Sequence, residues 1–433
     1  MPKRDQRARR SGGNGANADA RSFDKAGTST RPLLRRPPYA TAVPRWTNWS
    51  GNVRANPARL EAPRTEAEVQ EVVRAAARDG LAVRPAGSRH SFTALCATDG
   101  VALDLHHLAG VESIDAEAKT ATVLGGTRIS DLGTPLQAAG VALHNQGDVD
   151  TQTITGAIGT GTHGTGPTLR NMSSAVTGVR IVTAEGELRV CSPTSESQVF
   201  EAARLSLGAI GIATAVTLQC LPAYNLHERV WFEGPDESLE RLTERVEATR
   251  HYEFFWHPDR DLFEHKALQL TQSPADAMPH AKRERVDASA RIFPSIREQR
   301  FNEMEYAVPV DAGPECFTTL RKLMREVFTT ATWPVEYRTL AADDVWLSPA
   351  HRRHSVTISI HEDASLPYEQ LFRECEAVFL AHDGRPHWGK LHWRRAADLA
   401  PAYSEWDRFA AVREIVDPVG TFLNPYLRDL LGV

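Results

Sequence analysis

Three residues in the second half of the chain have the types and spacing needed to act on an oxygen-bearing substrate. Glu336 and Arg338 lie two residues apart, so on a β-strand both side chains would point to the same face. Lys390 follows Trp388 and Gly389, where a glycine lets the backbone pass close to a ligand. Arginine and lysine can stabilise a developing alkoxide, and a carboxylate can accept a proton or a hydrogen bond. A surface ion pair is the more common meaning of Glu-x-Arg, and lysine is normally solvent-exposed, so these residues alone leave both interpretations open.

Glycine-rich segments in the first half predict a cofactor site. Residues 85–92, Pro-Ala-Gly-Ser-Arg-His-Ser-Phe, place a Gly-Ser turn before His90. Backbone amides freed by such a turn can hold phosphate, although an ordinary tight turn with a solvated histidine is the simpler interpretation of this octapeptide alone. Residues 146–166 alternate Gly and Thr with little to pack, so the backbone can approach a long ligand while hydroxyls and amides donate to it. A third loop, residues 206–211, could hold the adenosine end, although a pair of packing glycines is the simpler explanation.

The second segment also invites a competing interpretation as a nicotinamide-dinucleotide site. Gly159, Gly161 and Gly164 have the spacing G-x-G-x-x-G. That fingerprint needs a strand before it and a helix directly after it, whereas Pro167 and a polar run follow here. The Lys-Ser or Lys-Thr of a phosphate-binding P-loop is also missing from this segment. We therefore do not favour a nicotinamide cofactor.

Local patterns predict the elements that position these residues. Thr65 and Glu68 have the spacing of a capping box, which predicts a helix from residue 65. Further helices are expected over residues 129–139, 238–249 and 313–329, and strands over residues 81–85, 101–105, 111–114, 120–123, 211–218, 252–256 and 301–308, with a hairpin at 179–190. Residues 274–294 are expected to form a surface loop or lid. The fold class is therefore α+β, ending in an antiparallel sheet flanked by helices.

Length and composition exclude several classes of protein. The chain of 433 residues exceeds what one hydrophobic core usually supports, so we expect two domains. A net charge of −5 is too small to indicate nucleic-acid binding. The five cysteines have no CxxC pairing and the histidines have no paired spacing, so we expect neither disulfides nor a metal. No stretch approaches the ~18 apolar residues of a membrane span, and we expect a cytoplasmic protein. Residues 1–43 are basic and poor in apolar residues, which predicts a disordered arm.

The three glycine-rich loops, in this order and spacing, resemble the vanillyl-alcohol-oxidase type of FAD-binding domain, especially its aldonolactone and alditol oxidase branch. From Trp46 onward the chain is similar to bacterial L-gulono-1,4-lactone or D-arabinono-1,4-lactone oxidases and dehydrogenases. The resemblance continues through residues 301–306, 336–338, 346–350, 387–390, 417–418 and 422–424. Arg89 departs from the glycine that is usual in the lactone oxidases and is more like the alditol oxidases.

The resemblance implies FAD as the cofactor, bound covalently through its 8α-methyl group to His90. It implies a cofactor site formed by Pro85, Ala86, Gly87, Ser88, Arg89, His90, Ser91, Gly147, Asp148, Thr155, Gly156, Ala157, Gly159, Thr160, Thr162, His163, Gly164, Gly208, Gly211, Ile212 and Asn424. Glu336, Arg338 and Lys390 are then catalytic, and they face the substrate. His392 either shares that face or is simply a packed imidazole.

The domains implied are an FAD-binding domain over residues 44–222, a substrate-capping domain over 223–394, and a C-terminal segment, 395–433, that completes the FAD domain. We expect the active site at their junction. The implied reaction is the oxidation of a small sugar-derived alcohol or aldono-1,4-lactone by hydride transfer to flavin N5. The alternatives are an alditol oxidase, a tailoring oxidase of secondary metabolism acting on another polar alcohol, and a flavin-binding protein without catalysis. Oxygen or an electron carrier would reoxidise the flavin, and an oxidase is slightly favoured.

Overall fold

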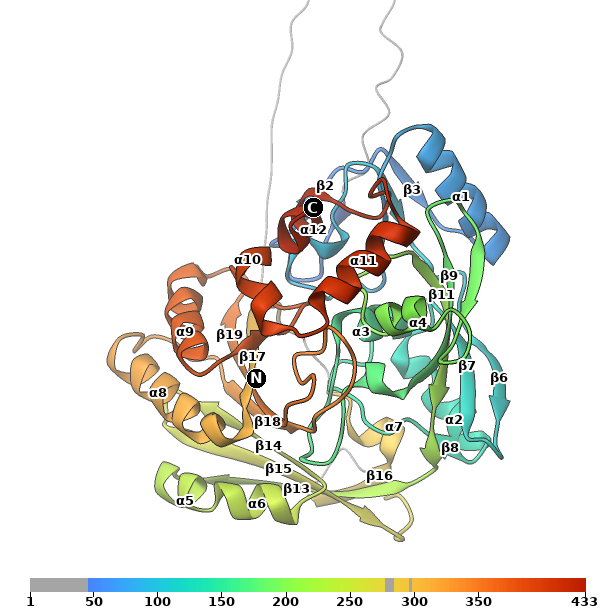
Figure 1. Ribbon diagram of the computed structural model, residues 1–433. Coiled ribbons are helices and arrows are strands. Elements are labelled where there is room, and N and C mark those ends of the chain that lie inside the picture. The colour runs from blue at the N-terminus through green and yellow to red at the C-terminus, as the bar shows by residue number, and fades with distance from the viewer. Residues whose placement is uncertain (1–45, 277–283, 296–297) are drawn as a thin grey trace, which may run out of the picture. The chain divides into compact units, whose positions relative to one another are not determined.

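The computed structural model describes residues 46–276, 284–295 and 298–433, which belong to one compact unit (Figure 1). The expected N-terminal arm lies outside the described residues. Helix α1 (Glu66–Arg78) begins as expected, because the side chain of Thr65 accepts a hydrogen bond from the backbone N–H of Glu68. No helix in the described ranges is long and apolar enough to cross a membrane.

Two sheets organise the amino-terminal half of this unit. A parallel sheet has the order β3 (Arg59–Glu61), β5 (Val101–Leu103) and β4 (Val83–Pro85). An antiparallel sheet has the order β10 (Leu188–Cys191), β9 (Val176–Val182), β11 (Ile212–Gln219), β7 (Thr120–Leu124) and β6 (Val111–Asp115). Short strand pairs join β1 (Trp46–Thr47) to β2 (Arg54–Ala55), and β8 (Val141–Ala142) to β12 (Leu221–Pro222). The helices of this half besides α1 are α2 (Gly133–Ala138), α3 (Ile154–Thr160) and α4 (Ser197–Ala203).

The carboxyl-terminal half contains an eight-stranded sheet in which every neighbouring pair is antiparallel. Its order is β16 (Glu284–Ala288), β13 (Asn225–Glu233), β15 (Leu262–Thr271), β14 (His251–His257), β18 (Val335–Leu340), β19 (Ser355–Asp363), β17 (Phe301–Pro309) and β20 (Arg385–Pro386). Its helices are α5 (Pro235–Glu240), α6 (Leu242–Ala248), α7 (Ser289–Ile292), α8 (Gly313–Glu326) and α9 (Glu369–Ala381). Figure 1 shows α5, α6, α8 and α9 on the side of the molecule away from the five-stranded sheet. The expected antiparallel sheet with flanking helices is confirmed.

The two faces of the eight-stranded sheet differ because side chains alternate along each strand. One face packs its aromatic and aliphatic residues against α6, α8 and α9 in a single hydrophobic core. On β18 that core takes Val335 and Tyr337, which leaves Glu336 and Arg338 on the opposite face. The same alternation places the polar residues of β14, β17 and β19 on the opposite face, and this polar face forms one wall of the site.

The C-terminal helices α10 (Ala396–Leu399), α11 (Trp406–Val416) and α12 (Pro425–Leu431) return to the amino-terminal half (Figure 1). Leu399, Phe409 and Leu427 share a hydrophobic core with residues of α3, α4 and β11. Val345 and Trp388, from the carboxyl-terminal half, join the same core. This core holds the two halves together around the site.

Three expected elements differ from the structure. The helix expected at residues 129–139 is a short 3₁₀ turn followed by α2 from Gly133, because Pro135 lacks an N–H and is tolerated only in a first helical turn. The helix expected at 238–249 begins earlier, with Pro235 in its first turn, and is interrupted at Arg241.

The prediction of a surface loop or lid over residues 274–294 is wrong for the second half of that segment. Residues 284–288 form the edge strand β16, paired with β13, and α7 follows. Ile292 and Phe293 pack against Leu226 and Leu268. The strand carries Glu284, Arg285 and Asp287, so its short pattern lacks the apolar alternation that would have predicted it.

Candidate active site

A cavity of about 760 Å³ lies between the glycine-rich segments and the polar face of the eight-stranded sheet. A second cavity of about 110 Å³ adjoins it and shares residues 87–91, Gln152 and Thr160. The predicted cofactor residues that line one or both cavities are Pro85, Ala86, Gly87, Ser88, Arg89, His90, Ser91, Gly147, Asp148, Thr155, Gly156, Gly159, Thr160, Thr162, His163, Gly208 and Gly211. Glu336, Arg338 and Lys390 line the larger cavity, so the structure brings them into one space with His90.

The first glycine-rich loop leaves a run of amides free for a ligand. Ala86 N donates to Leu103 O at 2.9 Å and Phe92 N donates to Gly389 O at 2.8 Å. Between them, the amides of residues 87–91 donate to no acceptor in the described part of the chain. A Cβ at Gly87 would lie 2.1 Å from Oγ1 of Thr153, so the loop passes too close to its neighbour for any other residue. Successive free amides suit the oxygens of a dinucleotide, and this loop therefore fits FAD.

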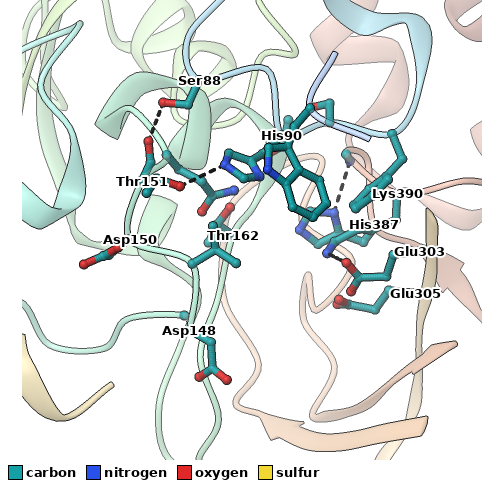
Figure 2. A pocket seen from close by; sticks show the side chains of 18 of the residues that line it. Ser88, His90, Asp148, Asp150, Thr151, Thr162, Glu303, Glu305, His387 and Lys390 are labelled. Carbon is teal, nitrogen blue, oxygen red and sulfur yellow. Dashed lines mark hydrogen bonds and ion pairs between the residues drawn. The ribbon is translucent and has the colours of Figure 1, made fainter. Parts of the chain in front are cut away.

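His90 is placed where the two cavities meet. Its ring stacks on Trp49 with centroids 5.1 Å apart, and its Nε2 lies 2.8 Å from Oγ1 of Thr151 (Figure 2). Burial lowers the pKa of His90 to about 4, and the ammonium of Lys390 adds to this effect. The imidazole is therefore neutral near pH 7, with one nitrogen lone pair available for reaction.

The second glycine-rich segment forms α3 and the turn that follows it. Thr155, Gly156, Gly159 and Thr160 line the smaller cavity from this helix. After the helix, Oγ1 of Thr162 is buried and has no hydrogen-bond partner in the described ranges, although the residue lines the larger cavity. Such a hydroxyl is a group that a bound ligand can satisfy.

The register of the eight-stranded sheet sets polar side chains opposite one another on the cavity face. The cross-strand pairs are Lys266 with Glu253, Glu253 with Arg338, Glu336 with Ser359, Ser359 with Glu305, and His361 with Glu303. Directly opposed residues have Cβ atoms about 4.5–5.5 Å apart, close enough for charged side chains to pair.

Arg338 contacts three carboxylates. Its Nε lies 2.7 Å from Oε2 of Glu253, and its Nη2 lies 2.6 Å from Oε1 of Glu336 and 3.2 Å from Oδ1 of Asp148. Lys266 adds a second cation, with Nζ 3.0 Å from Oε1 of Glu253. Burial raises the pKa of Glu336 to about 7 despite the attraction of Arg338, and Glu253 and Asp148 add to the increase. Burial alone would raise the pKa of Glu253, but Lys266 and Arg338 lower it instead. Glu336 is therefore a carboxyl that gains and loses its proton near neutral pH.

Lys390 is paired with a carboxylate from β17. Its Nζ contacts Oε2 of Glu303, and it lies 5.3 Å from the ring centroid of Phe92. The other oxygen of Glu303 is 3.6 Å from Nε2 of His361, whose Nδ1 lies 2.8 Å from the carbonyl of Pro334. Burial alone would raise the pKa of Glu303, but Lys390 and His361 lower it. The ammonium is thereby held at the cavity wall.

A third charged pair joins the second glycine-rich segment to the sheet. Nδ1 of His163 lies 2.8 Å from Gly164 O, and its Nε2 lies 2.6 Å from Oε1 of Glu305. Ser359 donates to the other oxygen of Glu305 at 3.0 Å. Burial works against a charged His163, but Glu305 and the backbone carbonyl outweigh it and raise the pKa of the imidazole. Burial lowers the pKa of the neighbouring His387 to about 4, so the pKa values of these two imidazoles, whose ring centroids are 5.9 Å apart, shift in opposite directions.

Three groups on this face bring metal-ligand atoms within 4.8 Å of one another. They are His163 with Glu305 and His387; Glu303 with Glu336 and His361; and Asp148 with Glu253 and Glu336. In each group at least one carboxylate already contacts Arg338, Lys390 or His163. These contacts favour a network of ion pairs, and the absence of a metal stays a prediction.

Five predicted residues line neither cavity, namely Ala157, Gly164, Ile212, His392 and Asn424. Ala157 and Ile212 belong to hydrophobic cores. Gly164 packs against Asn145, whose Oδ1 would lie 2.3 Å from a Cβ at that glycine. These three positions shape the elements that carry the cavity-lining residues.

The other two of the five are held by polar contacts behind the site. Asn424 caps α12 and donates to the carbonyls of Ala94 and Ala97, both at 2.7 Å. His392 is buried, with Nε2 3.4 Å from the hydroxyl of Tyr426. Two interpretations of His392 were open, and its buried position favours the packed imidazole over a substrate-facing role.

Several residues that line the larger cavity were not predicted as site residues, including Trp49, Thr151, Glu303, Glu305, His361 and His387. Glu303 and Glu305 could have been found, because they alternate with Met304 and Tyr306 along an expected strand. Trp49 and Thr151 carry no such signal.

Comparisons with known proteins agree with an FAD-binding fold. A family profile described as D-arabinono-1,4-lactone oxidase matches residues 262–430, and one described as FAD binding domain matches residues 57–192. Among solved structures, the chain is similar to a solvent-stable cholesterol oxidase, with a TM-score of 0.78 and 19% identity over 90% of this chain and 97% of that one. It is also similar to cholesterol oxidase from B. sterolicum, with a TM-score of 0.79 and 16% identity over 89% and 96%. The expected two-domain FAD-binding fold is confirmed.

Curated relatives match this chain over nearly the whole of their own length. L-gulono-1,4-lactone dehydrogenase of Mycobacterium tuberculosis is 37% identical, over 90% of this chain and 99% of the relative. L-gulonolactone oxidase of Bos taurus is 28% identical, over 89% and 98%. Alditol oxidase of a Streptomyces strain is 29% identical, over 90% and 99%.

Proposed function

Because this chain belongs to the family of FAD-dependent aldonolactone and alditol oxidoreductases, we propose that it oxidises a hydroxyl of a small sugar-derived alcohol or aldono-1,4-lactone, with FAD attached to His90. One observation carries the proposal. Arg338 and Lys390, each held by carboxylates, line the same cavity as His90 and the loop of free amides. A hydroxyl-bearing substrate in that cavity would meet fixed positive charge on one side and the cofactor site on the other.

The cofactor would be held by the first loop and by α3. The free amides of residues 87–91 supply donors for its oxygens, and the glycines of α3 let its rings approach the backbone. When bound, FAD supplies the acceptor for the hydride that leaves the substrate carbon. The neutral imidazole of His90 can form the covalent bond, since its lone pair is not protonated near pH 7.

The side chains of the sheet would orient and activate the substrate hydroxyl. The guanidinium of Arg338 and the ammonium of Lys390 offer donors for an oxygen that becomes negative as the hydride departs. Glu253 and Glu303 keep these cations in place before substrate arrives, so little reorganisation is needed during reaction. We assign the role of proton acceptor to Glu336, because its pKa near 7 suits a general base at neutral pH.

A substrate panel with purified protein under anaerobic conditions tests this function. We expect an aldono-1,4-lactone or an alditol to bleach the bound flavin, and the faster of the two classes identifies the substrate. Arg89 and the similarity to an alditol oxidase favour including alditols beside the lactones. Flavin that no lactone, alditol or other polar alcohol reduces would indicate a binding protein without catalysis. Turnover in air compared with turnover on a dye or cytochrome then separates oxygen from an electron carrier as the acceptor.

A second experiment tests the covalent bond. Protein precipitated with acid should stay yellow, and His90→Ala should release all of its flavin under the same treatment. Release of free flavin from the wild-type chain would contradict the assignment of His90.

A further inference from the structure

Thr151 holds the imidazole of His90 from the second glycine-rich segment. Its Oγ1 lies 2.8 Å from Nε2 of His90, and the hydroxyl of Ser88 donates to its carbonyl oxygen (Figure 2). Trp49 stacks on the imidazole and restricts rotation of the ring. No described residue makes a hydrogen bond to Nδ1 of His90. Thr151 therefore decides which ring nitrogen is engaged and which is available.

We propose that Thr151 is a positioning residue for covalent attachment of the flavin, which holds Nε2 of His90 so that Nδ1 reacts. This inference rests on the proposed attachment of FAD to His90. No other described side chain makes a hydrogen bond to this imidazole. Two charged groups influence its pKa, Lys390 and Glu303, and these pair with each other.

The hydroxyl of Thr151 suits the imidazole both before and after the bond forms. Before attachment, Nε2 carries the hydrogen and donates it to Oγ1, which leaves the lone pair on Nδ1. After attachment, Nδ1 is substituted and the neutral imidazole has its lone pair on Nε2, so the hydroxyl must donate instead. A threonine hydroxyl can do both, because it is a donor and an acceptor and it rotates.

The step balances in atoms and electrons. The lone pair of Nδ1 forms a bond to the 8α carbon of the flavin, and that carbon loses one hydrogen as a proton. Nε2 loses its hydrogen as a second proton, and one of the two protons passes to solvent in the cavity. The two electrons and the other proton remain on the flavin ring, and the acceptor that serves turnover, oxygen or a carrier, takes up the electrons while that proton is released.

The test follows covalent incorporation in full-length protein produced with little riboflavin and then supplied with FAD. Covalent flavin is measured as fluorescence on a denaturing gel, and total flavin is measured before denaturation. We expect Thr151→Val to slow incorporation by roughly 5- to 10-fold, the loss of one hydrogen bond between an exposed hydroxyl and a half-buried imidazole. Thr151→Ser keeps the hydroxyl and should incorporate flavin at nearly the wild-type rate. Thr318→Val removes an exposed hydroxyl from α8 and serves as the matched control.

The outcomes separate the two proposals. If the wild-type chain incorporates no covalent flavin, the assignment of His90 fails. If the wild-type chain is covalently loaded and Thr151→Val matches its time course, the inference about Thr151 is overturned and the His90 assignment stands. Equal loss of covalent and total flavin in both Thr151→Val and Thr151→Ser would show a merely structural role and also overturn the inference.

Discussion

Nη2 of Arg338 lies 2.6 Å from Oε1 of Glu336, two residues before it on the same strand. Across the strand pair, Nε of Arg338 lies 2.7 Å from Oε2 of Glu253. The pKa values of the two carboxyls move in opposite directions, because Lys266 compensates Glu253 while burial prevails at Glu336. The pair thus offers the cavity one permanent positive charge and one carboxyl that changes its protonation state near neutral pH.

The raised pKa of Glu336 predicts a component of stability that is lost with rising pH. Burial raises that pKa from its usual 4.5 to about 7, so between these values the folded chain binds more protons than the unfolded chain. The free energy of unfolding contributed by this residue is full below about pH 4.5 and falls as the pH rises to about 7. Glu336→Gln should remove this decrease, which is on the order of 3 kcal/mol. Urea titrations at several pH values measure the free energy of unfolding. If it depends on pH in the same way in the wild-type protein and in Glu336→Gln, the prediction is contradicted.

The same carboxyl predicts the pH dependence of the chemical step. If Glu336 accepts the hydroxyl proton, flavin reduction should accelerate as the pH rises through about 7 and this group ionises. Glu336→Gln should reduce the rate by about 10²- to 10⁴-fold and abolish the dependence, as measured by anaerobic mixing across this pH range. An unchanged pH profile in the variant would assign the proton to another group.

Lys390 and Glu303 are predicted to act as a unit. Lys390→Met should slow flavin reduction by about 10²- to 10³-fold, because it removes a preorganised cation from the cavity. Glu303→Gln should slow flavin reduction less, since the ammonium of Lys390 stays in the cavity and loses only the carboxylate that holds it. In the double variant the two effects should not add, because both changes interrupt one contact. Lys322→Met, on an exposed part of α8, is the control, and strictly additive losses would show that the two residues act separately.

Arg89 is predicted to be strained where glycine would not be. Its φ of 63° lies in the left-handed region, which costs an L-residue about 1–2 kcal/mol. Arg89→Gly and Arg89→Ala lose the same contacts, but only glycine removes the strain, at some cost in chain entropy. Arg89→Gly should therefore be more stable than Arg89→Ala by roughly 0.5 to 1 kcal/mol in urea unfolding. Equal stability, or a more stable alanine variant, would contradict this.

Local patterns predicted β14 and β17, which carry part of the site, but not β18, α3 or how the strands pair. Alternation along a strand was enough to place Glu336 and Arg338 on one face, and a capping box was enough to begin α1 at Glu66. Glu253 and Lys266 were not predicted as partners of Arg338. Their positions depend on the register between β14, β15 and β18, in which Glu253 and Arg338 are 85 residues apart. The register between strands that are far apart in the chain cannot be predicted from a short stretch of sequence.

Contacts between loops were also beyond prediction. Thr151 reaches His90 only because two glycine-rich segments, 61 residues apart, fold against each other. The edge strand β16 was missed because its charged residues suit a loop as well as an exposed strand. By contrast, the three residues that the resemblance implied as catalytic, Glu336, Arg338 and Lys390, do line one cavity, and their contact with the substrate stays a prediction.

The rate of anaerobic flavin reduction in Arg338→Lys tests the central claim most directly. This change keeps the positive charge among Glu336, Glu253 and Asp148, so it avoids the destabilisation expected when Arg338→Ala leaves buried carboxylates unpaired. It removes the planar fork that can hold two oxygens at once. With the best lactone or alditol as substrate, stopped-flow reduction should slow by about 10²- to 10³-fold at unchanged flavin content and melting temperature. A variant that is reduced at nearly the wild-type rate would show that the substrate does not meet Arg338 and that the proposed active site is wrong.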